Sequence, residues 1–151
     1  MKIHKTMIRP VDTDSSETWT LTATDENNLH IFERQILRKI FGPVNIDSVW
    51  RTRNNTEIDK LIDGADIVRF IKTQRIKWLG QIQRMDEARP NRKLIDWKPI
   101  GNIPAGRPRQ RWQHDVMEDL KKMKVKSWKE IAKERRTWRD LAERAKTHKG
   151  L

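Results

Sequence analysis

Apolar residues recur at intervals of three and four along most of the chain, a spacing that predicts α-helices. The clearest run predicts a helix over residues 23–41, with an apolar face formed by Leu29, Phe32, Ile36 and Ile40. Thr22 and Asp25 have the spacing of a capping box at the start of this helix. Gly42 and the proline after it end the helix in the order expected of a C-terminus.

A second long helix is predicted over residues 66–85. One stripe of this helix carries Ile67, Ile71, Trp78, Ile82 and Met85. Val68 and Leu79 lie beside the stripe and widen the apolar arc beyond that of an ordinary surface helix. Two packing partners, one on each side, would explain this width.

Shorter helices are predicted in several other segments. They comprise a piece ending at Arg9 before Pro10, a helix over 55–62, a helix over 91–97, a helix over 107–123 with Pro108 in its first turn, and a last helix over 127–146. Ser127 and Glu130 have capping-box spacing at the start of the last helix. Residues 44–54, which include Trp50, are predicted to form a loop.

These elements predict an all-α protein, an irregular array of about five to six helices. The length of 151 residues fits one domain or two small lobes. We expect an N-terminal helical lobe over 1–64, a hinge near 55–64 and a basic helical lobe over 65–151. A linker over 86–107, rich in proline and glycine, would interrupt the second lobe.

The net charge of +12 is spread unevenly along the chain. Residues 1–64 carry a net charge of −1 and residues 65–151 a net charge of +13. Such asymmetry points to a polyanion bound by the second half. The alternative is that the charge serves only solubility.

The densest positive charge lies in the turn Pro104-Ala-Gly-Arg-Pro-Arg-Gln-Arg-Trp112. Its three arginines lead into a predicted helix N-terminus, where backbone amides favour anions, and guanidinium groups pair well with phosphates. The alternative is an exposed linker with no ligand. The candidate nucleic-acid contacts are Arg107, Arg109 and Arg111, together with Lys72, Lys77, Arg84, Arg92 and Lys93.

Candidate catalytic or metal-binding groups are sparse. Asp115, Glu118 and Asp119 would share one helix face and could hold Mg²⁺, although a surface pair between Glu118 and Lys122 explains the spacing as well. The four histidines are scattered and no phosphate-binding glycine loop is present. We therefore expect no catalytic residues, no metal and no cofactor.

Six of the seven tryptophans divide into two groups. Four of them lie on apolar stripes and are predicted to be core residues: Trp78, Trp112, Trp128 and Trp138. Trp50 and Trp97 lie in or beside irregular basic stretches, where they could stack on bases or pack against a helix.

Cysteine is absent, which excludes disulfides, zinc knuckles and thiol nucleophiles. There is no apolar run long enough to span a membrane and no signal-peptide core at the N-terminus. We expect a nuclear or cytoplasmic protein.

Several short motifs occur in order along nearly the whole chain. They are Arg9-Pro-Val, Ser16-Glu-Thr-Trp-Thr-Leu-Thr22, Phe32-Glu-Arg-Gln-Ile-Leu-Arg-Lys-Ile-Phe-Gly-Pro43, Arg75-Ile-Lys-Trp-Leu-Gly80, Arg84-Met85, Gly106-Arg-Pro-Arg-Gln-Arg-Trp112 and Trp138-Arg. In this order they resemble the C-terminal region, the thumb and post-palm part, of non-LTR retrotransposon endonuclease–reverse transcriptase polyproteins. The chain departs from the family pattern at Asp14-Ser15, where Tyr-Gly is usual, and at Gln81, where histidine is usual.

The resemblance implies that the endonuclease and the polymerase palm with its metal-binding aspartates lie upstream in such polyproteins and are absent from this chain. It also implies a thumb-like role in gripping template RNA or target DNA. A family arrangement with a C-terminal nuclease beside a cysteine–histidine knuckle is excluded, because the chain has no cysteine.

Three function classes follow. The favoured hypothesis is a non-catalytic fragment of a reverse transcriptase that binds RNA or DNA without sequence preference through its basic half. The second is a protein-interaction module, or a transposon remnant without a nucleic-acid role, whose helix over 66–85 docks another protein or the rest of a reverse transcriptase. The third, an enzyme, would need metal-bound carboxylates that the sequence does not offer.

Overall fold

The computed structural model describes residues 4–97, 111–148 and 150–151. Two short helical pieces, η1 (His4–Ile8) and η2 (Ser16–Thr18), accompany the α-helices near the N-terminus. The described α-helices are α1 (Arg9–Asp12), α2 (Ala23–Phe41), α3 (Asn55–Ile62), α4 (Ile67–Gln83), α5 (Pro90–Asp96), α6 (Trp112–Lys122), α7 (Trp128–Lys133) and α8 (Arg135–Ala145). One small hairpin pairs β1 (Val44–Ile46) with β2 (Val49–Arg51). The protein is therefore mostly helical, as predicted, with a small sheet that the sequence pattern did not predict.

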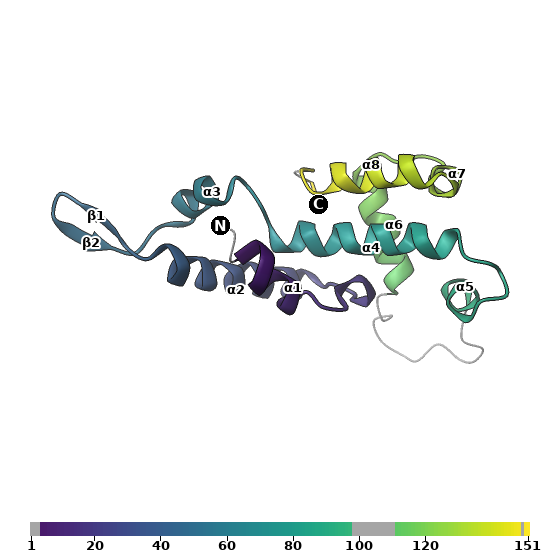
Figure 1. The fold of residues 1–151 in the computed structure, drawn as a ribbon, viewed down its shortest axis with the longest axis horizontal. Coiled ribbons are helices and arrows are strands. Elements are labelled where there is room, and N and C mark those ends of the chain that lie inside the picture. Colours follow the sequence, from purple (N-terminus) through teal and green to yellow (C-terminus); the bar gives the residue numbers. More distant parts are fainter. Residues whose placement is uncertain (1–3, 98–110, 149) are drawn as a thin grey trace.

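Helix α4 lies at the centre of the molecule. Figure 1 shows α2 and the N-terminal pieces along one side of α4, α7 and α8 along the other, and α6 crossing it. Ile67, Ile71, Ile76 and Leu79 of α4 are at most 1% exposed. The wide apolar arc predicted for this helix is explained, as expected, by packing partners on both of its sides.

Three clusters of buried side chains hold the helices together. The largest joins α4, α6, α7 and α8 around Trp138, Leu120 and Val116. A second joins Leu21 to the first turns of α4, and a third joins Leu37 of α2 to Ile58 and Ile62 of α3. Burial of these apolar side chains is the main source of stability for such a fold.

The approach of α8 to α4 depends on Gly80. A Cβ atom at this position would lie 2.0 Å from Nε1 of Trp138, so a side chain larger than hydrogen does not fit. The indole Nε1–H of Trp138 donates to the backbone oxygen of Ile76 at 2.9 Å. Gly80 and Trp138 belong to two motifs far apart in the sequence, and the fold places them in direct contact.

Helix α2 has the predicted boundaries, but its buried face is rotated from the predicted one. Thr22 and Asp25 form the predicted capping box, and Gly42 has a φ of +64° at the end of the helix. Leu37 and Glu33 are buried, however, whereas Phe32 and Ile40 are 40% and 37% exposed. The predicted face is therefore correct in part, because Leu29 and Ile36 are partly buried and Leu29 packs against the cluster around Ile67.

Two partners satisfy the Glu33 carboxylate. Arg9 donates to its Oε1 at 2.9 Å, and the backbone N–H of Ile67 donates to its Oε2 at 3.0 Å. His4 lies 3.7 Å from Oε1. Burial, and next the positive charge of Arg9, lower the pKa of the His4 imidazole. A paired carboxylate of this kind can face the interior, and it rotates α2 relative to the apolar prediction.

The predicted loop over 44–54 is instead a β-hairpin. Val44 pairs with Arg51 and Ile46 with Val49 in antiparallel register. Asp47 and Ser48 at the tip have φ values of 51° and 64°, the left-handed conformation that two-residue hairpin turns require. Val49 and Trp50 are 66% and 67% exposed, so the hairpin has no buried face and gave no clear alternating pattern.

Several predicted helix ends need correction. The N-terminal helix continues through Pro10, which occupies the first turn of α1. The helix predicted over 127–146 is divided at Glu134, whose extended backbone separates α7 from α8. Ser127 does not form a capping box, because its φ of 51° turns the backbone into the left-handed region and its side chain makes no cap hydrogen bond.

Contacts join the two sequence halves that were predicted as separate lobes. The indole of Trp112 donates to the backbone oxygen of Glu17 at 2.7 Å, and the N–H of Leu21 donates to Asp115 at 3.2 Å. The division into 1–64 and 65–151 stays a prediction. Within the described segments, no helix combines the length and the apolar character needed to cross a membrane.

Candidate nucleic-acid interface

Most of the predicted basic turn lies outside the residues that the structure describes. Arg107 and Arg109 lie outside the described residues. Arg111 is described: it is exposed and immediately precedes α6. The side chain of Arg111 is therefore accessible to a ligand at the N-terminus of this helix.

Lys72 is not at the surface, and the expectation that it contacts phosphates is wrong. Its side chain is 3% exposed. The ammonium Nζ lies 2.6 Å from Oε1 of Glu26 on α2 and 3.7 Å from Oδ1 of Asp119 on α6. Lys72 is thus neutralised by the acids of neighbouring helices.

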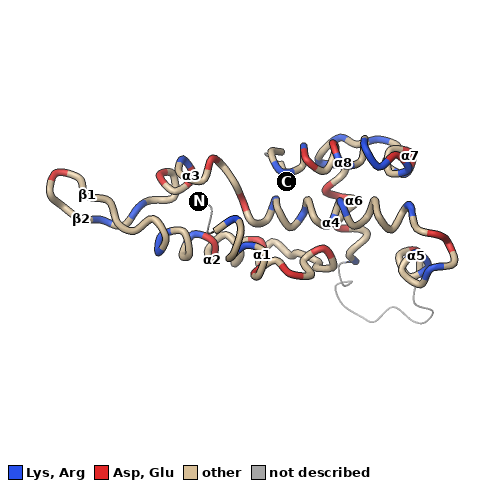
Figure 2. The backbone as a smooth tube through the Cα atoms, viewed as in Figure 1, with Lys and Arg blue, Asp and Glu red and all other residues tan. Residues whose placement is uncertain are grey.

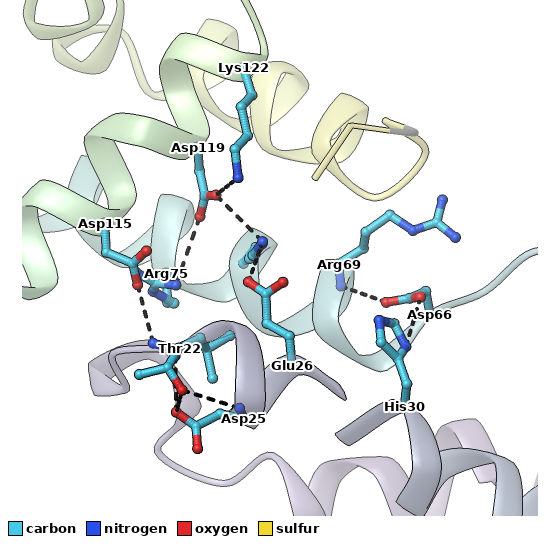
Figure 3. Close-up of polar contacts among 12 residues, drawn as sticks. Thr22, Asp25, Glu26, His30, Asp66, Arg69, Arg75, Asp115, Asp119 and Lys122 are labelled. Atoms are coloured by element: carbon cyan, nitrogen blue, oxygen red, sulfur yellow. Dashed lines mark hydrogen bonds and ion pairs between the residues drawn. The ribbon is translucent and has the colours of Figure 1, made fainter. Parts of the chain in front are cut away.

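Arg75 belongs to the same buried group. It is fully buried and pairs with Asp115, and its Nη1 lies 3.8 Å from Oδ2 of Asp119 (Figure 3). Burial is the largest influence on the Asp119 carboxyl and raises its pKa, against the opposing effects of Lys72 and Arg75. This cluster ties α4 to α6 and has a structural role.

Two acids of the candidate magnesium site, Asp115 and Asp119, belong to the same cluster. Asp115 and Asp119 point toward α4 and accept from its cations, whereas Glu118 is exposed on another side of α6. Lys122 lies 3.9 Å from Asp119, so the expected surface pair involves Asp119 rather than Glu118. In the part of the chain that the structure describes, no group of three or more potential ligands could hold a metal.

Two of the predicted cations, Lys77 and Arg84, lie together on an open groove between α4 and α8. The groove has a volume of about 760 Å³. Its lining comprises Lys77, Gln81, Arg84, Arg135, Arg136, Trp138, Arg139 and Glu143. Five of these eight residues carry positive charge and one carries negative charge, so the groove is strongly cationic.

The cations of the groove crowd one another. The Nη1 of Arg84 donates to the backbone oxygen of Ala132 at 2.7 Å, which holds its guanidinium against the end of α7. Burial, and next the positive charge of Arg135, lower the pKa of Arg84. An anion in the groove would relieve this repulsion.

Glu143, the acidic residue that lines the groove, pairs with two lysines. Glu143 Oε1 lies 3.1 Å from Lys77, and Glu143 also accepts from Lys146. Hydrogen bonds from Lys146 and then Lys77 lower the pKa of Glu143. For Arg135 and Arg136 the described residues include no acid within ion-pair distance, and both side chains are exposed.

Sequence reasoning missed the arginines of α8. Arg135 and Arg136 occupy the first turn of α8. That turn has no acidic residue, and the N-cap residue Glu134 makes no side-chain cap hydrogen bond. Figure 2 shows basic residues gathered along α7 and α8. The spacing of Arg135 and Arg136 to Arg139 by four and three residues, opposite the apolar positions of Trp138 and Leu141, was the signal that could have identified them.

Arg92 and Lys93 lie elsewhere, on α5. Arg92 is partly buried and lies 3.7 Å from Asp96, whereas Lys93 is exposed. Neither residue lines the groove between α4 and α8. The structure therefore divides the predicted contacts among the groove, helix α5 and the N-terminus of α6.

The tryptophans largely follow the predicted division. Trp138 is 2% exposed, and Trp112 and Trp128 are partly buried against the main cluster. Trp78 is also partly buried. Trp50 and Trp97 are 67% and 61% exposed, which leaves their rings accessible.

Comparison with known proteins gives one informative similarity. No family model matches the chain, and no solved structure matches it. A transposon-derived protein of Caenorhabditis elegans is 21% identical over 154 residues, which cover 98% of this chain and 55% of that protein. The chain thus spans about half the length of this curated relative. The similarity supports a transposon-related origin for the chain.

Proposed function

We propose that the protein binds RNA or DNA without sequence preference, as a non-catalytic fragment related to the C-terminal region of non-LTR retrotransposon reverse transcriptases. The transposon-related similarity and the resemblance of the ordered motifs support this origin. The net charge of +13 in residues 65–151 supports a polyanionic ligand.

The observation that carries the proposal is the groove between α4 and α8. Arg135 and Arg136 lie at the positive end of α8, where an anion is favourable. The N-cap residue Glu134 is the acid next to them, and its carboxylate accepts from the Thr137 hydroxyl. Among the described residues it forms no ion pair with either arginine. Arg84, Lys77 and Arg139 complete the cationic lining. The side chains contact phosphates rather than base edges, so the binding tolerates any sequence.

A salt titration tests the proposal. The wild-type protein is titrated with single-stranded RNA and duplex DNA at about 50 and 200 mM salt, where several phosphate contacts produce a steep loss of affinity. A triple variant, Arg135→Gln, Arg136→Gln and Arg139→Gln, should weaken binding to both ligands. For duplex DNA it should also reduce the slope of log affinity against log salt by about 0.9 for each phosphate that the variant no longer neutralises.

The matched control removes the same charge from the other half of the molecule. Lys5, Lys39 and Lys60 are exposed, and their replacement by glutamine should leave affinity nearly unchanged. The proposal is wrong if wild-type binding is weak and insensitive to salt. It is also wrong if the control triple variant loses as much affinity as the groove variant.

We also propose that the chain does not polymerise or cut nucleic acid. Polymerases and nucleases of this kind use carboxylate-bound metal ions, and Asp115 and Asp119 of α6 are engaged with Arg75 and Lys72. Primer extension with the purified chain and Mg²⁺ should give no product. Extension that is abolished by Asp115→Asn would contradict this expectation.

The second candidate function is a protein-interaction module. Helix 66–85 was the predicted docking surface, but most of the apolar arc of α4 is covered by the chain's own helices. The observation that favours the function lies elsewhere: Met7, Val11, Ile31 and Phe32 expose between 40% and 77% of their surface. This candidate predicts a monomer that gains helicity, measured by circular dichroism, with a protein partner and not with nucleic acid.

A further inference from the structure

A second cavity lies on α4, next to the basic groove. It has a volume of about 570 Å³ and is lined by one tryptophan from each of three segments: Trp78 of α4, Trp97 after α5 and Trp112 of α6. Ile82, Leu94 and Ile95 complete its apolar walls. Trp78 and Ile82 follow Lys77 and Gln81 of the groove by one residue, so the two sites occupy neighbouring faces of the same helix, about 100° apart.

We call this cavity the aromatic pocket. Its polar side chains indicate which kind of ligand it can bind. Asn91 and Gln113 contribute amides that both donate and accept hydrogen bonds. Among the lining residues that the structure describes, Arg111 contributes the one charged side chain and there is no carboxylate. A flat ring with polar edges, attached to a negatively charged backbone, complements this combination.

Two walls of the pocket are suited to stacking. The Trp112 ring is held in place because its Nε1–H donates to the backbone oxygen of Glu17 at 2.7 Å. Trp97 is 61% exposed, which leaves surface of its ring open to a ligand. A fixed ring and an accessible ring on one cavity form a platform of the kind on which proteins stack unpaired bases.

We propose that the aromatic pocket holds an unpaired base of single-stranded RNA or DNA whose phosphate backbone is contacted by Arg111. Charge complementarity argues for this occupant, because among the described lining residues the charge is positive and the neighbouring groove is cationic. A duplex does not fill the pocket, because its bases are stacked inside the helix. This inference rests on the proposed nucleic-acid binding and adds a preference for single strands.

Matched oligomers test the inference. The full chain is titrated with a fluorescein-labelled oligothymidylate of about 12 nucleotides and with an abasic oligomer of equal length and charge. The wild-type protein should bind the oligothymidylate at least about fivefold more tightly. Trp97→Ala should remove this preference and leave the affinity for the abasic oligomer unchanged.

Trp50→Ala is the matched control, because Trp50 is as exposed as Trp97 but lies on the hairpin. It should keep the preference for bases. Circular dichroism of both variants checks that the fold is retained, as expected for exposed side chains.

The outcomes separate this inference from the function on which it rests. Equal, salt-sensitive binding of both oligomers by the wild-type protein overturns the base pocket and leaves the groove proposal intact. Loss of the preference in Trp50→Ala rather than Trp97→Ala moves stacking to the hairpin and likewise overturns it. Failure to bind either oligomer at low salt refutes the proposed function and the base pocket together.

Discussion

Single residues decide how closely the helices of this protein approach one another. Gly80 leaves room for the Trp138 ring to lie directly on the backbone of α4. The hydrogen bond from Trp138 to the Ile76 oxygen adds a polar contact inside the main apolar cluster. This contact positions α8 against α4, and α8 in turn positions the arginines of the basic groove.

Gly80→Ala should therefore destabilise the protein, although alanine is the better helix former by about 1 kcal/mol. The added methyl group displaces the Trp138 ring, and overpacking of a core typically costs about 1–3 kcal/mol. Urea denaturation followed by circular dichroism measures the change. Gln81→Ala, at the exposed neighbouring position, should change stability little. A stabilised Gly80→Ala variant would show that the ring does not contact the backbone.

Glu57 stabilises the hairpin and the start of α3 through local charge. The Arg51 guanidinium, and next the backbone N–H of Asn54, lower the pKa of Glu57 from 4.5 to about 2. Because the pKa is lower in the folded state, the stabilisation is fully present above pH 4.5 and is lost as pH falls from 4.5 toward 2.

An NMR titration of the Glu57 carboxyl should give a midpoint near 2, and Arg51→Ala should raise that midpoint. A wild-type midpoint near 4.5 would contradict the contact between Arg51 and Glu57. The direct readout on Glu57 separates this effect from the titration of other acids.

At the scale of elements, helix ends are set by local backbone chemistry. After α6, the N–H of Lys124 donates to Lys121 and the N–H of Val125 donates to Leu120, the two bonds of a Schellman motif. Lys124 has a φ of 57°, a conformation that favours glycine over a residue with a side chain.

Lys124→Gly should stabilise the protein by up to about 1 kcal/mol, because it removes the strain of a left-handed lysine. The same change at Lys121, an exposed position inside α6, should destabilise it by about 1 kcal/mol. The two variants have the same composition, so thermal unfolding compares position alone. Equal effects of both variants would contradict the helix end described here.

At the scale of the whole molecule, buried ion pairs fix how the helices are arranged. Arg75 and Lys72 of α4 pair with Asp115 and Asp119 of α6, and Lys72 also pairs with Glu26 of α2. These contacts connect the centre of the fold to both sequence halves. They also remove Lys72 from the set of cations that a ligand can reach.

Arg75→Met should destabilise the protein by about 3–5 kcal/mol, because the Asp115 carboxylate loses its guanidinium in a buried site. Adding Asp115→Asn to the same chain should cost less than it does alone, since the two residues are coupled. Arg136→Met, on the surface, should change stability by less than about 0.5 kcal/mol. Urea denaturation of the single and double variants measures the coupling, and additive effects of the first two substitutions would show that the pair does not stabilise the fold.

The sequence predicted part of the candidate site. Lys77 and Arg84 were among the nucleic-acid contacts predicted from the sequence, and both line the groove. Arg135, Arg136 and Arg139 complete that groove from a helix more than 50 residues further along the chain. These arginines reach the groove because α8 packs against α4 at Gly80. A local sequence pattern does not predict this packing.

The sequence by itself determined the helical class, the bounds of α2 and the approximate positions of α3, α4 and α5. Those features follow from hydrogen bonds and side-chain spacings within a few residues, such as the capping box of Thr22 and Asp25. Tertiary structure alone decided which face of α2 is buried and which cations stay free. The reason is that burial of a charge depends on a partner distant in the sequence, as Glu33 meets Ile67 and Arg75 meets Asp115.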